Sequence, residues 1–210
     1  LMSGRLTWPA VAMLLRSPDS GLDALIAPGH VSTVMGPEEW EFVPRQHGIP
    51  AAIAGFTAES LLQATHAVLR QIRDGDRRLD NCYPAVVRQG GNSEARRLLS
   101  DCFDVVDAPW RGIGSIPASG YALKPALAAH DARRHFPDAA AGGRRRAGEM
   151  PPGCDCARVV LGKISPPECR LYGAACMPRA PVGPCMVSDE GACRIWWASG
   201  IRERTKSLPA

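Results

Sequence analysis

Residues 153–193 read GCDCARVVLGKISPPECRLYGAACMPRAPVGPCMVSDEGAC and contain six of the chain's eight cysteines. Thiolates are soft ligands that suit iron and zinc, so six of them this close together indicate more than packing. Three arrangements are physically sensible: a metal or iron–sulfur site, a disulfide framework, or a mixture of both. Prolines and glycines interrupt the stretch throughout, which excludes one long helix and predicts short helical turns and loops.

The spacing of these cysteines leaves the kind of site open. The first two, Cys154 and Cys156, form a C-x-C pair. The other four follow at longer intervals, as Cys169, Cys176, Cys185 and Cys193. This pattern matches neither the tight run of bacterial ferredoxins nor the paired C-x₂-C of structural zinc sites. A zinc site or a four-iron cluster needs four thiolates, which leaves two that could form a disulfide or dithiol beside it. Metal or cluster binding is favoured, and zinc competes with iron–sulfur.

The bulk composition is that of an ordinary globular protein. The 210 residues are 45% hydrophobic, which suits one large domain, or a medium domain with a small appendage. No apolar run approaches the roughly 18 residues that span a bilayer, and the N-terminus lacks the pattern of a signal peptide. Because the cysteines are clustered, a cytoplasmic protein with a local metal site fits better than a secreted, disulfide-stapled one.

Strands and helices alternate ahead of the cysteines. We expect a helix over 9–16, strands over 22–27 and 50–55, and a helical piece between the strands at 37–43. Two apolar strands joined by a helical crossover predict a parallel βαβ unit. The expected fold class is therefore α/β, with a Rossmann-like parallel domain followed by a small, loop-rich and helical cysteine module.

Further elements complete the first domain. The clearest helix is expected over 57–73, capped by Thr57. Its apolar residues share one face at helical spacing: Leu61, Leu62, Thr65, Val68, Leu69 and Ile72. Asn92 is expected to cap a shorter helix, and 103–107 is a candidate third strand. A glycine-rich loop at 110–117 and a broken helical region to Phe136 follow.

The domain boundary is expected where periodicity is lost. Residues 139–152 are rich in alanine, glycine, arginine and proline and read as a linker between domains at 1–138 and 153–210. The basic run Arg144–Arg146 lies in it without interleaved aromatics. With a net charge of only +4, this run favours a solvated linker over a nucleic-acid partner.

Ligands of a parallel sheet gather at the C-terminal ends of its strands. His30 and Phe56 are expected there, and Trp110-Arg111 could join them. His30 and Arg111 are therefore possible cleft residues. A local hydrogen bond for His30, or a structural salt bridge for Arg111, is the competing interpretation.

Seven blocks of sequence resemble the HypD family of nickel–iron hydrogenase maturation factors. They are APGHVST (27–33), GIPAAIAGF (48–56), WRGIGSIPASG (110–120), DARRHF (131–136), GCDC (153–156), PPECRLYGAACMP (166–178) and PVGPCMVSDEGAC (181–193). The match runs in order across nearly the whole chain, and the last two blocks are the most specific.

The resemblance implies a scaffold on which the hydrogenase iron acquires two cyanides and one carbon monoxide. Such proteins act in a cytoplasmic complex with a HypC-type chaperone and a HypE-type cyanide donor. From charge and hydropathy, neither a nucleic acid nor a membrane is expected as a partner. Their implied fold has two α/β domains around a cleft and a C-terminal module that holds a [4Fe–4S] cluster. That module is similar to the cluster site of ferredoxin–thioredoxin reductase.

The resemblance also divides the six cysteines into two groups. It implies that the cluster ligands are Cys154, Cys169, Cys176 and Cys193. Cys156 and Cys185 would then form a neighbouring redox dithiol or disulfide. Because a C-x-C pair permits either member to ligate, the partition is less firmly implied than the set.

Two family motifs are not found in this sequence. They are a Cys-Gly-Thr-His type motif and a Pro-Gly-Cys-Pro-Val-Cys type motif, which hold the iron being decorated. The chain is therefore expected to be a fragment or truncated form that contributes the redox module, with Cys82 serving only in packing. Two rival interpretations stay open: a zinc-binding or metal-free interaction remnant, and a stand-alone cluster-dependent disulfide reductase. Whether the chain is an enzyme is left open with them.

Overall fold

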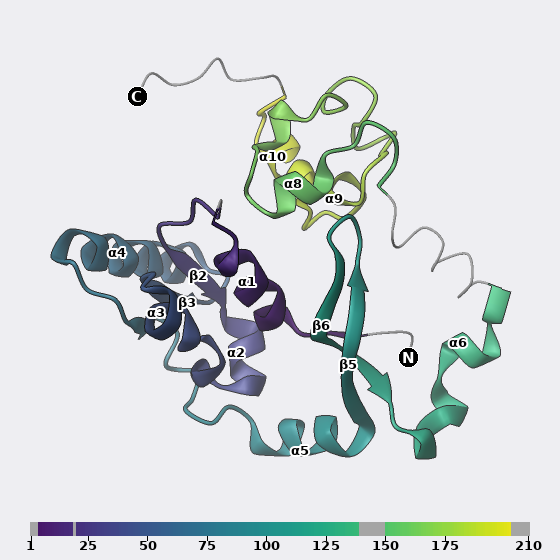
Figure 1. The fold of residues 1–210 in the computed structure, drawn as a ribbon. Helices are drawn as coiled ribbons and strands as arrows, with labels where there is room; N and C mark the ends of the chain where they lie inside the picture. Colours follow the sequence, from purple (N-terminus) through teal and green to yellow (C-terminus); the bar gives the residue numbers. More distant parts are fainter. Residues whose placement is uncertain (1–3, 19, 139–149, 203–210) are drawn as a thin grey trace. The chain divides into compact units, whose positions relative to one another are not determined.

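The computed structural model describes residues 4–18, 20–138 and 150–202 and divides the chain into two compact units (Figure 1). The α/β unit comprises the described residues up to 106 together with 118–131. The cysteine unit comprises 107–117 and the described residues from 132 onward. The expected linker at 139–152, with Arg144–Arg146, lies for the most part outside the described residues.

The α/β unit is built on a parallel sheet of three strands in the order β2-β3-β4. The strands are β2 (Leu25–Pro28), β3 (Ala51–Ala54) and β4 (Leu79–Asn81). The helical elements between them are α2 (Gly29–Met35), η1 (Pro37–Trp40), α3 (Phe42–His47) and α4 (Ala58–Asp74), and α1 (Thr7–Arg16) precedes them. The expected parallel α/β architecture is confirmed. Sequence reasoning missed α2 and β4.

The two faces of this sheet carry different cores. On one face Ala51 and Ile53 pack with Leu15, Trp40 and Val43. On the other face Ala52 and Ala54 pack with Ala64 and Val68 of α4. Small side chains on that second face let the backbone of α4 approach the sheet closely.

The apolar face predicted for α4 is not the face that the helix buries. The helix buries Ser60, Ala64, Val68 and Gln71, and of these only Val68 belongs to the predicted apolar face. Its bulky aliphatic residues lie exposed on an adjacent side, which we call the outer leucine face: Leu61, Leu62, Leu69 and Ile72. The reason is steric, because a sheet face lined with alanine accommodates small helix residues and leaves the leucines outside.

The ends of two helices follow the expected capping rules. The Thr57 hydroxyl accepts a hydrogen bond from the Ser60 amide at the start of α4, at 3.2 Å. Gly75, with φ of 77°, ends the helix in the left-handed conformation that glycine tolerates. The Asn92 carbonyl oxygen accepts from the Ala95 amide, at 3.0 Å, and begins α5 (Ser93–Cys102).

The candidate third strand at 103–107 does not join the parallel sheet. It is part of β5 (Phe103–Trp110), which pairs with β6 (Gly114–Leu123) in a separate sheet of order β1-β6-β5, where β1 is Gly4–Arg5. The glycine-rich loop is thus a hairpin turn, closed by the Ile113 amide donating to the Trp110 carbonyl at 3.0 Å. The expected helical region begins only after β6, with η2 (Pro125–His130) and α6 (Ala132–His135).

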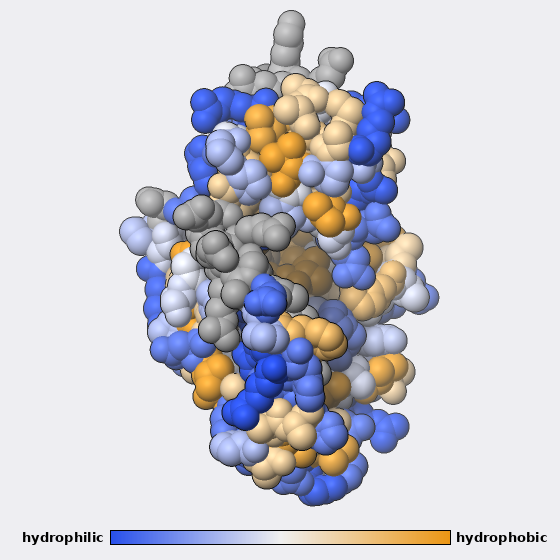
Figure 2. Space-filling model, turned by 90° about the vertical axis from the view of Figure 1, so that its right-hand side faces the viewer, coloured by the Kyte–Doolittle hydropathy of each residue, from blue (hydrophilic) through white to orange (hydrophobic). Residues whose placement is uncertain are grey.

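Hydrophobic and hydrophilic residues alternate in small groups over the face of the molecule in Figure 2. The cysteine unit exposes three aliphatic residues, Val160, Val187 and Ile195. Isolated apolar residues of this kind are ordinary on a globular surface. Within the described residues, no helix combines the length and the apolar content that crossing a membrane requires.

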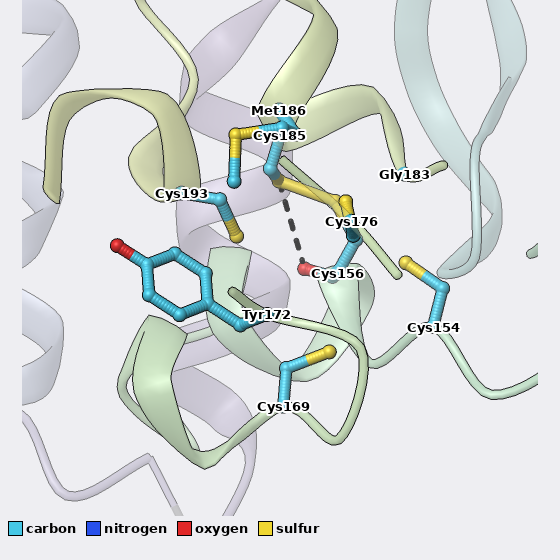
Figure 3. A pocket seen from close by; sticks show the side chains of 9 residues that line it. All are labelled: Cys154, Cys156, Cys169, Tyr172, Cys176, Gly183, Cys185, Met186 and Cys193. Carbon is cyan, nitrogen blue, oxygen red and sulfur yellow. Dashed lines mark hydrogen bonds between the residues drawn. A yellow bond between two sulfur atoms is a disulfide. The ribbon is translucent and has the colours of Figure 1, made fainter. Parts of the chain in front are cut away.

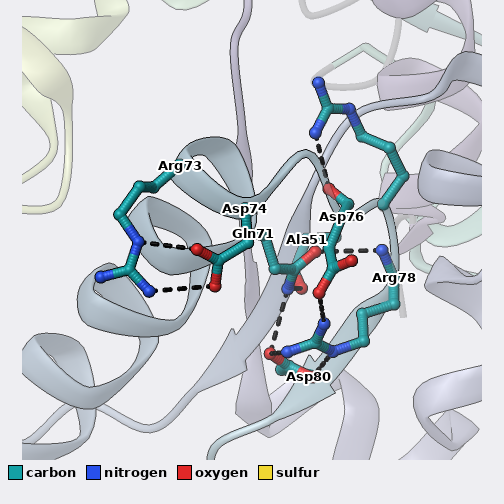
Figure 4. A network of polar contacts seen from close by, with 8 residues as sticks. Ala51, Gln71, Arg73, Asp74, Asp76, Arg78 and Asp80 are labelled. Carbon is teal, nitrogen blue, oxygen red and sulfur yellow. Dashed lines mark hydrogen bonds and ion pairs between the residues drawn. The ribbon is translucent and has the colours of Figure 1, made fainter.

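Gln71 fixes the end of α4 to the sheet through a buried polar network (Figure 4). Its amide nitrogen donates to the Ala51 carbonyl at 3.3 Å and to the Asp80 carboxylate at 3.0 Å. Its carbonyl oxygen accepts from the Arg78 amide at 3.0 Å. The side chain thereby ties α4, β3 and β4 together and leaves none of these buried polar atoms unpaired.

Replacing Gln71 with leucine is expected to lower the free energy of unfolding by about 1–3 kcal/mol, because volume is kept while buried partners lose their hydrogen bonds. Urea unfolding followed by tryptophan fluorescence measures this. Gln63→Leu is the matched control, since Gln63 is exposed and makes one long hydrogen bond to Glu59. Equal stability of the two variants would contradict the role of the network.

Candidate functional site

All six cysteines of the 153–193 stretch meet around one small cavity, which we call the cysteine pocket (Figure 3). Its lining consists of Cys154, Cys156, Cys169, Tyr172, Cys176, Gly183, Cys185, Met186 and Cys193. Most of these side chains, together with Val159, form the buried core of the cysteine unit, and the half-buried Cys154 packs against that core. Burial of the pocket and stability of this unit therefore depend on the same residues.

Short helices place three of the cysteines. They are α8 (Cys156–Val160), α9 (Pro184–Val187) and α10 (Ala192–Ala198), carrying Cys156, Cys185 and Cys193 respectively. Pro184 begins α9, where its fixed φ suits the first helical position. Short turns between prolines and glycines let these helices converge, as the punctuation of the sequence predicts.

A tight loop places Cys169 and Cys176. It follows the 3-10 turn η3 (Pro166–Glu168), which is closed by the Glu168 carboxylate accepting from the Ser165 amide at 2.7 Å. The Cys176 amide donates to the Leu171 carbonyl at 2.8 Å, and Gly173 turns the chain with φ of 74°. The Tyr172 hydroxyl donates to the Ile201 carbonyl at 2.5 Å and anchors the loop.

Cys156 and Cys185 form a disulfide, with Cα atoms 6.1 Å apart. It joins α8 to α9 and lies on the wall of the cysteine pocket. The Cys185 sulfur lies 3.9 Å from the Cys156 carbonyl oxygen. A disulfide sulfur carries no proton, so this contact becomes a weak hydrogen bond only when the pair is reduced.

The other four cysteines of the pocket are free thiols. Cys169, Cys176 and Cys193 are buried, and Cys154 is half-buried. Burial, with the neighbouring thiols, raises the pKa of Cys193 to about 12, and burial also raises the pKa of Cys154. Binding a metal or cluster would therefore release protons from these two sulfurs.

One backbone group already points at a free sulfur. The Val182 amide donates to the Cys176 sulfur at 3.4 Å. Hydrogen bonds to ligand sulfurs stabilise the thiolate and tune the potential of iron–sulfur sites. Next along the chain, Gly183 leaves room for the Cys154 sulfur, which a Cβ at this position would overlap.

The four free thiols fit a [4Fe–4S] cluster in number and in chemistry, because such clusters take four cysteine thiolates. The cavity between the side chains measures about 10 Å³, the room of about one water molecule. As the side chains stand in the described part of the chain, no group of three or more His, Cys, Asp or Glu is arranged to hold a metal ion. A cluster is larger than this cavity, so the thiols would have to move apart to admit one.

His30 and Phe56 lie where the sequence placed them, after the C-terminal ends of β2 and β3. Their rings contact each other, with centroids 5.1 Å apart, and both residues are exposed. Arg111 lies in the β5–β6 turn and belongs to the cysteine unit, whereas His30 belongs to the α/β unit. Cys82 is half-buried and packs against the Ala52–Ala54 side of the sheet.

Sequence reasoning missed three residues of the cysteine pocket. Met186 is almost fully buried in it, Tyr172 packs edge-on against Trp197 with centroids 5.9 Å apart, and Gly183 contacts Cys154. Each lies within a few residues of a cysteine in the same short loops. Nearness to a cysteine in the sequence could have pointed to these residues. It does not tell which neighbours line the pocket, because the conformation of the loops decides that.

Comparison with known proteins identifies the family of this chain. A family model described as "HypD: Hydrogenase formation hypA family" matches residues 1–200. The chain is 38% identical over 201 residues to "Hydrogenase maturation factor HypD" of Azotobacter vinelandii, a match that covers 93% of this chain and 52% of that protein. Proteins of the same name from Rhodobacter capsulatus and Escherichia coli K12 are 39% and 37% identical, each over 90% of this chain and 50% of the relative.

The chain thus spans about half the length of the curated relatives it matches. The similarity extends over both compact units and includes the whole cysteine pocket. The resemblance seen in the sequence is confirmed, and this chain belongs to the HypD family.

Proposed function

We propose that this chain contributes a redox module to the cytoplasmic assembly of the Fe(CN)₂CO centre of [NiFe] hydrogenase. The module would be a [4Fe–4S] cluster on Cys154, Cys169, Cys176 and Cys193, beside the redox pair Cys156 and Cys185. One observation supports this most directly: a single pocket holds four free thiols and one disulfide. The relatives named as hydrogenase maturation factors supply the process in which the module would act.

The redox chemistry of the Cys156–Cys185 pair follows from the two cysteines and their surroundings. Reduction of the Cys156–Cys185 disulfide breaks one S–S bond, takes up two electrons and two protons, and leaves a thiol on each cysteine. The reduced Cys185 thiol can then donate to the Cys156 carbonyl, which holds the pair close for reoxidation. A bound cluster would supply electrons one at a time.

The iron that receives cyanide and carbon monoxide is the substrate of this process. We propose that residues outside this chain hold that iron, since the two family motifs for it do not occur in the sequence. A HypC-type chaperone and a HypE-type cyanide donor are the partners proposed for the assembly. The role of the chain is then electron handling, not ligation of the substrate iron.

Metal analysis after anaerobic purification tests this proposal. The chain is expected to contain about four irons and about four sulfides. Cys169→Ser is expected to lose most of both, because one iron would lack a thiolate ligand. Cys102→Ser is the control, since Cys102 is a free cysteine outside the pocket. One zinc without sulfide, or a full cluster in Cys169→Ser, would refute the proposed module.

A further inference from the structure

We propose that the outer leucine face of α4, together with Ile26 at the edge of the sheet, is a docking surface. Its occupant would be a strand–helix segment from the half of a HypD-family protein that this chain does not span. This proposal is independent of the cluster and depends only on family membership and on the α/β unit.

The outer leucine face carries large aliphatic side chains of the kind found in protein cores, yet these side chains are exposed to solvent. Leu62 and Leu69 are 70% and 58% exposed, and Leu61 and Ile72 are each above 40%. A solvated helix face normally carries polar or charged residues. Single exposed leucines need no explanation, but four large aliphatic residues on one side of one helix indicate a binding surface.

Helical geometry places this face on the β2 side of α4. Gln71 points toward β4, because its amide nitrogen binds the Asp80 carboxylate. Val68 faces the sheet, and at 100° per residue Leu61 and Ile72 lie on the opposite flank of Val68 from Gln71. These two aliphatic side chains therefore project over β2.

Ile26 extends the same surface onto the sheet. It pairs in register with Ala52, whose side chain faces α4, so Ile26 points to the same side of the sheet. Yet it is 39% exposed, because β2 is one of the two edge strands of the sheet in the described residues. The apolar surface thus runs from an unpaired strand edge to the flank of the neighbouring helix.

One kind of partner would cover Ile26 and the outer leucine face at the same time. Parallel sheets are normally buried on both faces, and a parallel strand is joined to its neighbour by a crossover helix that packs on the sheet. A strand added beside β2, with its helix beside α4, would bury Ile26 and the outer leucine face together. Two helices pack at about 8–10 Å, which suits side chains of leucine size.

The length of the relatives identifies the source of this segment. The match with the Azotobacter vinelandii protein covers 93% of this chain and only 52% of that protein, so about half of the relative has no counterpart here. Interfaces between parts of one permanent structure resemble a domain core cut in half, as the outer leucine face does. A second copy of this chain is the rival occupant.

Co-expression tests the proposal with the full chain. The half of the Azotobacter vinelandii protein that does not align with this chain is expressed in the same cells, and a tag on this chain is used for purification. The two are expected to co-purify in equal amounts. Leu61→Glu/Leu69→Glu is expected to lower the co-purified amount more than about tenfold, because two charges would have to be buried.

Gln63→Glu/Arg70→Gln is the matched control. It makes the same net change of charge on another side of α4 and is expected to leave co-purification unchanged. Circular dichroism of each purified variant checks that the fold is kept. No co-purification of the two soluble halves, or equal co-purification with the leucine variant, overturns the proposal. So does a dimer of this chain alone that the leucine variant dissociates.

Discussion

A chain carrying Cys156→Ser is expected to bind about four irons and four sulfides, as the parent chain does, while losing its two-electron thiol chemistry. The expectation follows from the pocket, where Cys156 is bonded to Cys185 and the other four cysteines are free. Removing one member of the disulfide should leave the four proposed ligands untouched. It should also abolish the only S–S bond of the described residues.

Thiol titration in denaturant, after acid removal of any cluster, measures whether the disulfide is lost. The parent should titrate six thiols before reduction and eight after it. Cys156→Ser should titrate seven both times, which is the eight cysteines of the chain less one. Iron and sulfide analysis of the same samples measures whether the four irons and four sulfides are kept.

The converse variant decides between the two members of the C-x-C pair. Cys154→Ser is expected to lose the cluster and to keep the disulfide, because Cys154 is the free thiol that contacts Gly183. Loss of iron from Cys156→Ser, with retention in Cys154→Ser, would exchange their proposed roles. Turnover of a disulfide substrate by the isolated parent chain would favour the stand-alone reductase instead.

The cysteine pocket shows how far spacing alone can lead. Six thiols in 153–193 predicted a shared site, and the structure brings all six around one cavity. Spacing could not say which pair would bond, because Cys156 and Cys185 are 29 positions apart and only the convergence of α8 and α9 joins them. The resemblance to the HypD family paired these two, and the structure shows them bonded.

In the parallel sheet, the local sequence predicts two strands and misses the third. The apolar runs of β2 and β3 were predictable because both strands are flanked by turns and lined with small or aliphatic residues. β4 was missed because Leu79–Asn81 is short and contains one apolar residue. Its place is set by tertiary contacts that no local pattern reveals, namely the pairing with β3 and the hydrogen bonds of Gln71 to Asp80 and to the Arg78 amide.

On α4 the predicted apolar face and the buried face differ. The spacing places the leucines on one face of the helix, and a face of this kind usually points toward the core. The structure buries the small residues Ser60 and Ala64 instead, against a sheet face built from Ala52 and Ala54. Side-chain size on the partner sheet decided the orientation, and that information lies outside the helix.

A pair of glutamate substitutions on α4 should therefore have opposite outcomes. Ala64→Glu is expected to lower the free energy of unfolding by about 3–5 kcal/mol or to prevent folding of the α/β unit, because Ala64 is fully buried and the charge would have no partner. Leu69→Glu is expected to change stability by no more than about 0.5 kcal/mol, as for other exposed positions. Urea unfolding followed by tryptophan fluorescence, to which the buried Trp40 contributes, measures both.

Ala64→Ser is the control for position, since a hydroxyl can bond to the preceding helical turn and adds little volume. It is expected to cost much less than Ala64→Glu. A large loss of stability in Leu69→Glu, measured on the chain alone, would mean that the outer leucine face is already covered within this chain. The docking surface would then have no room for a partner, whereas a neutral Leu69→Glu leaves the face free to bind one.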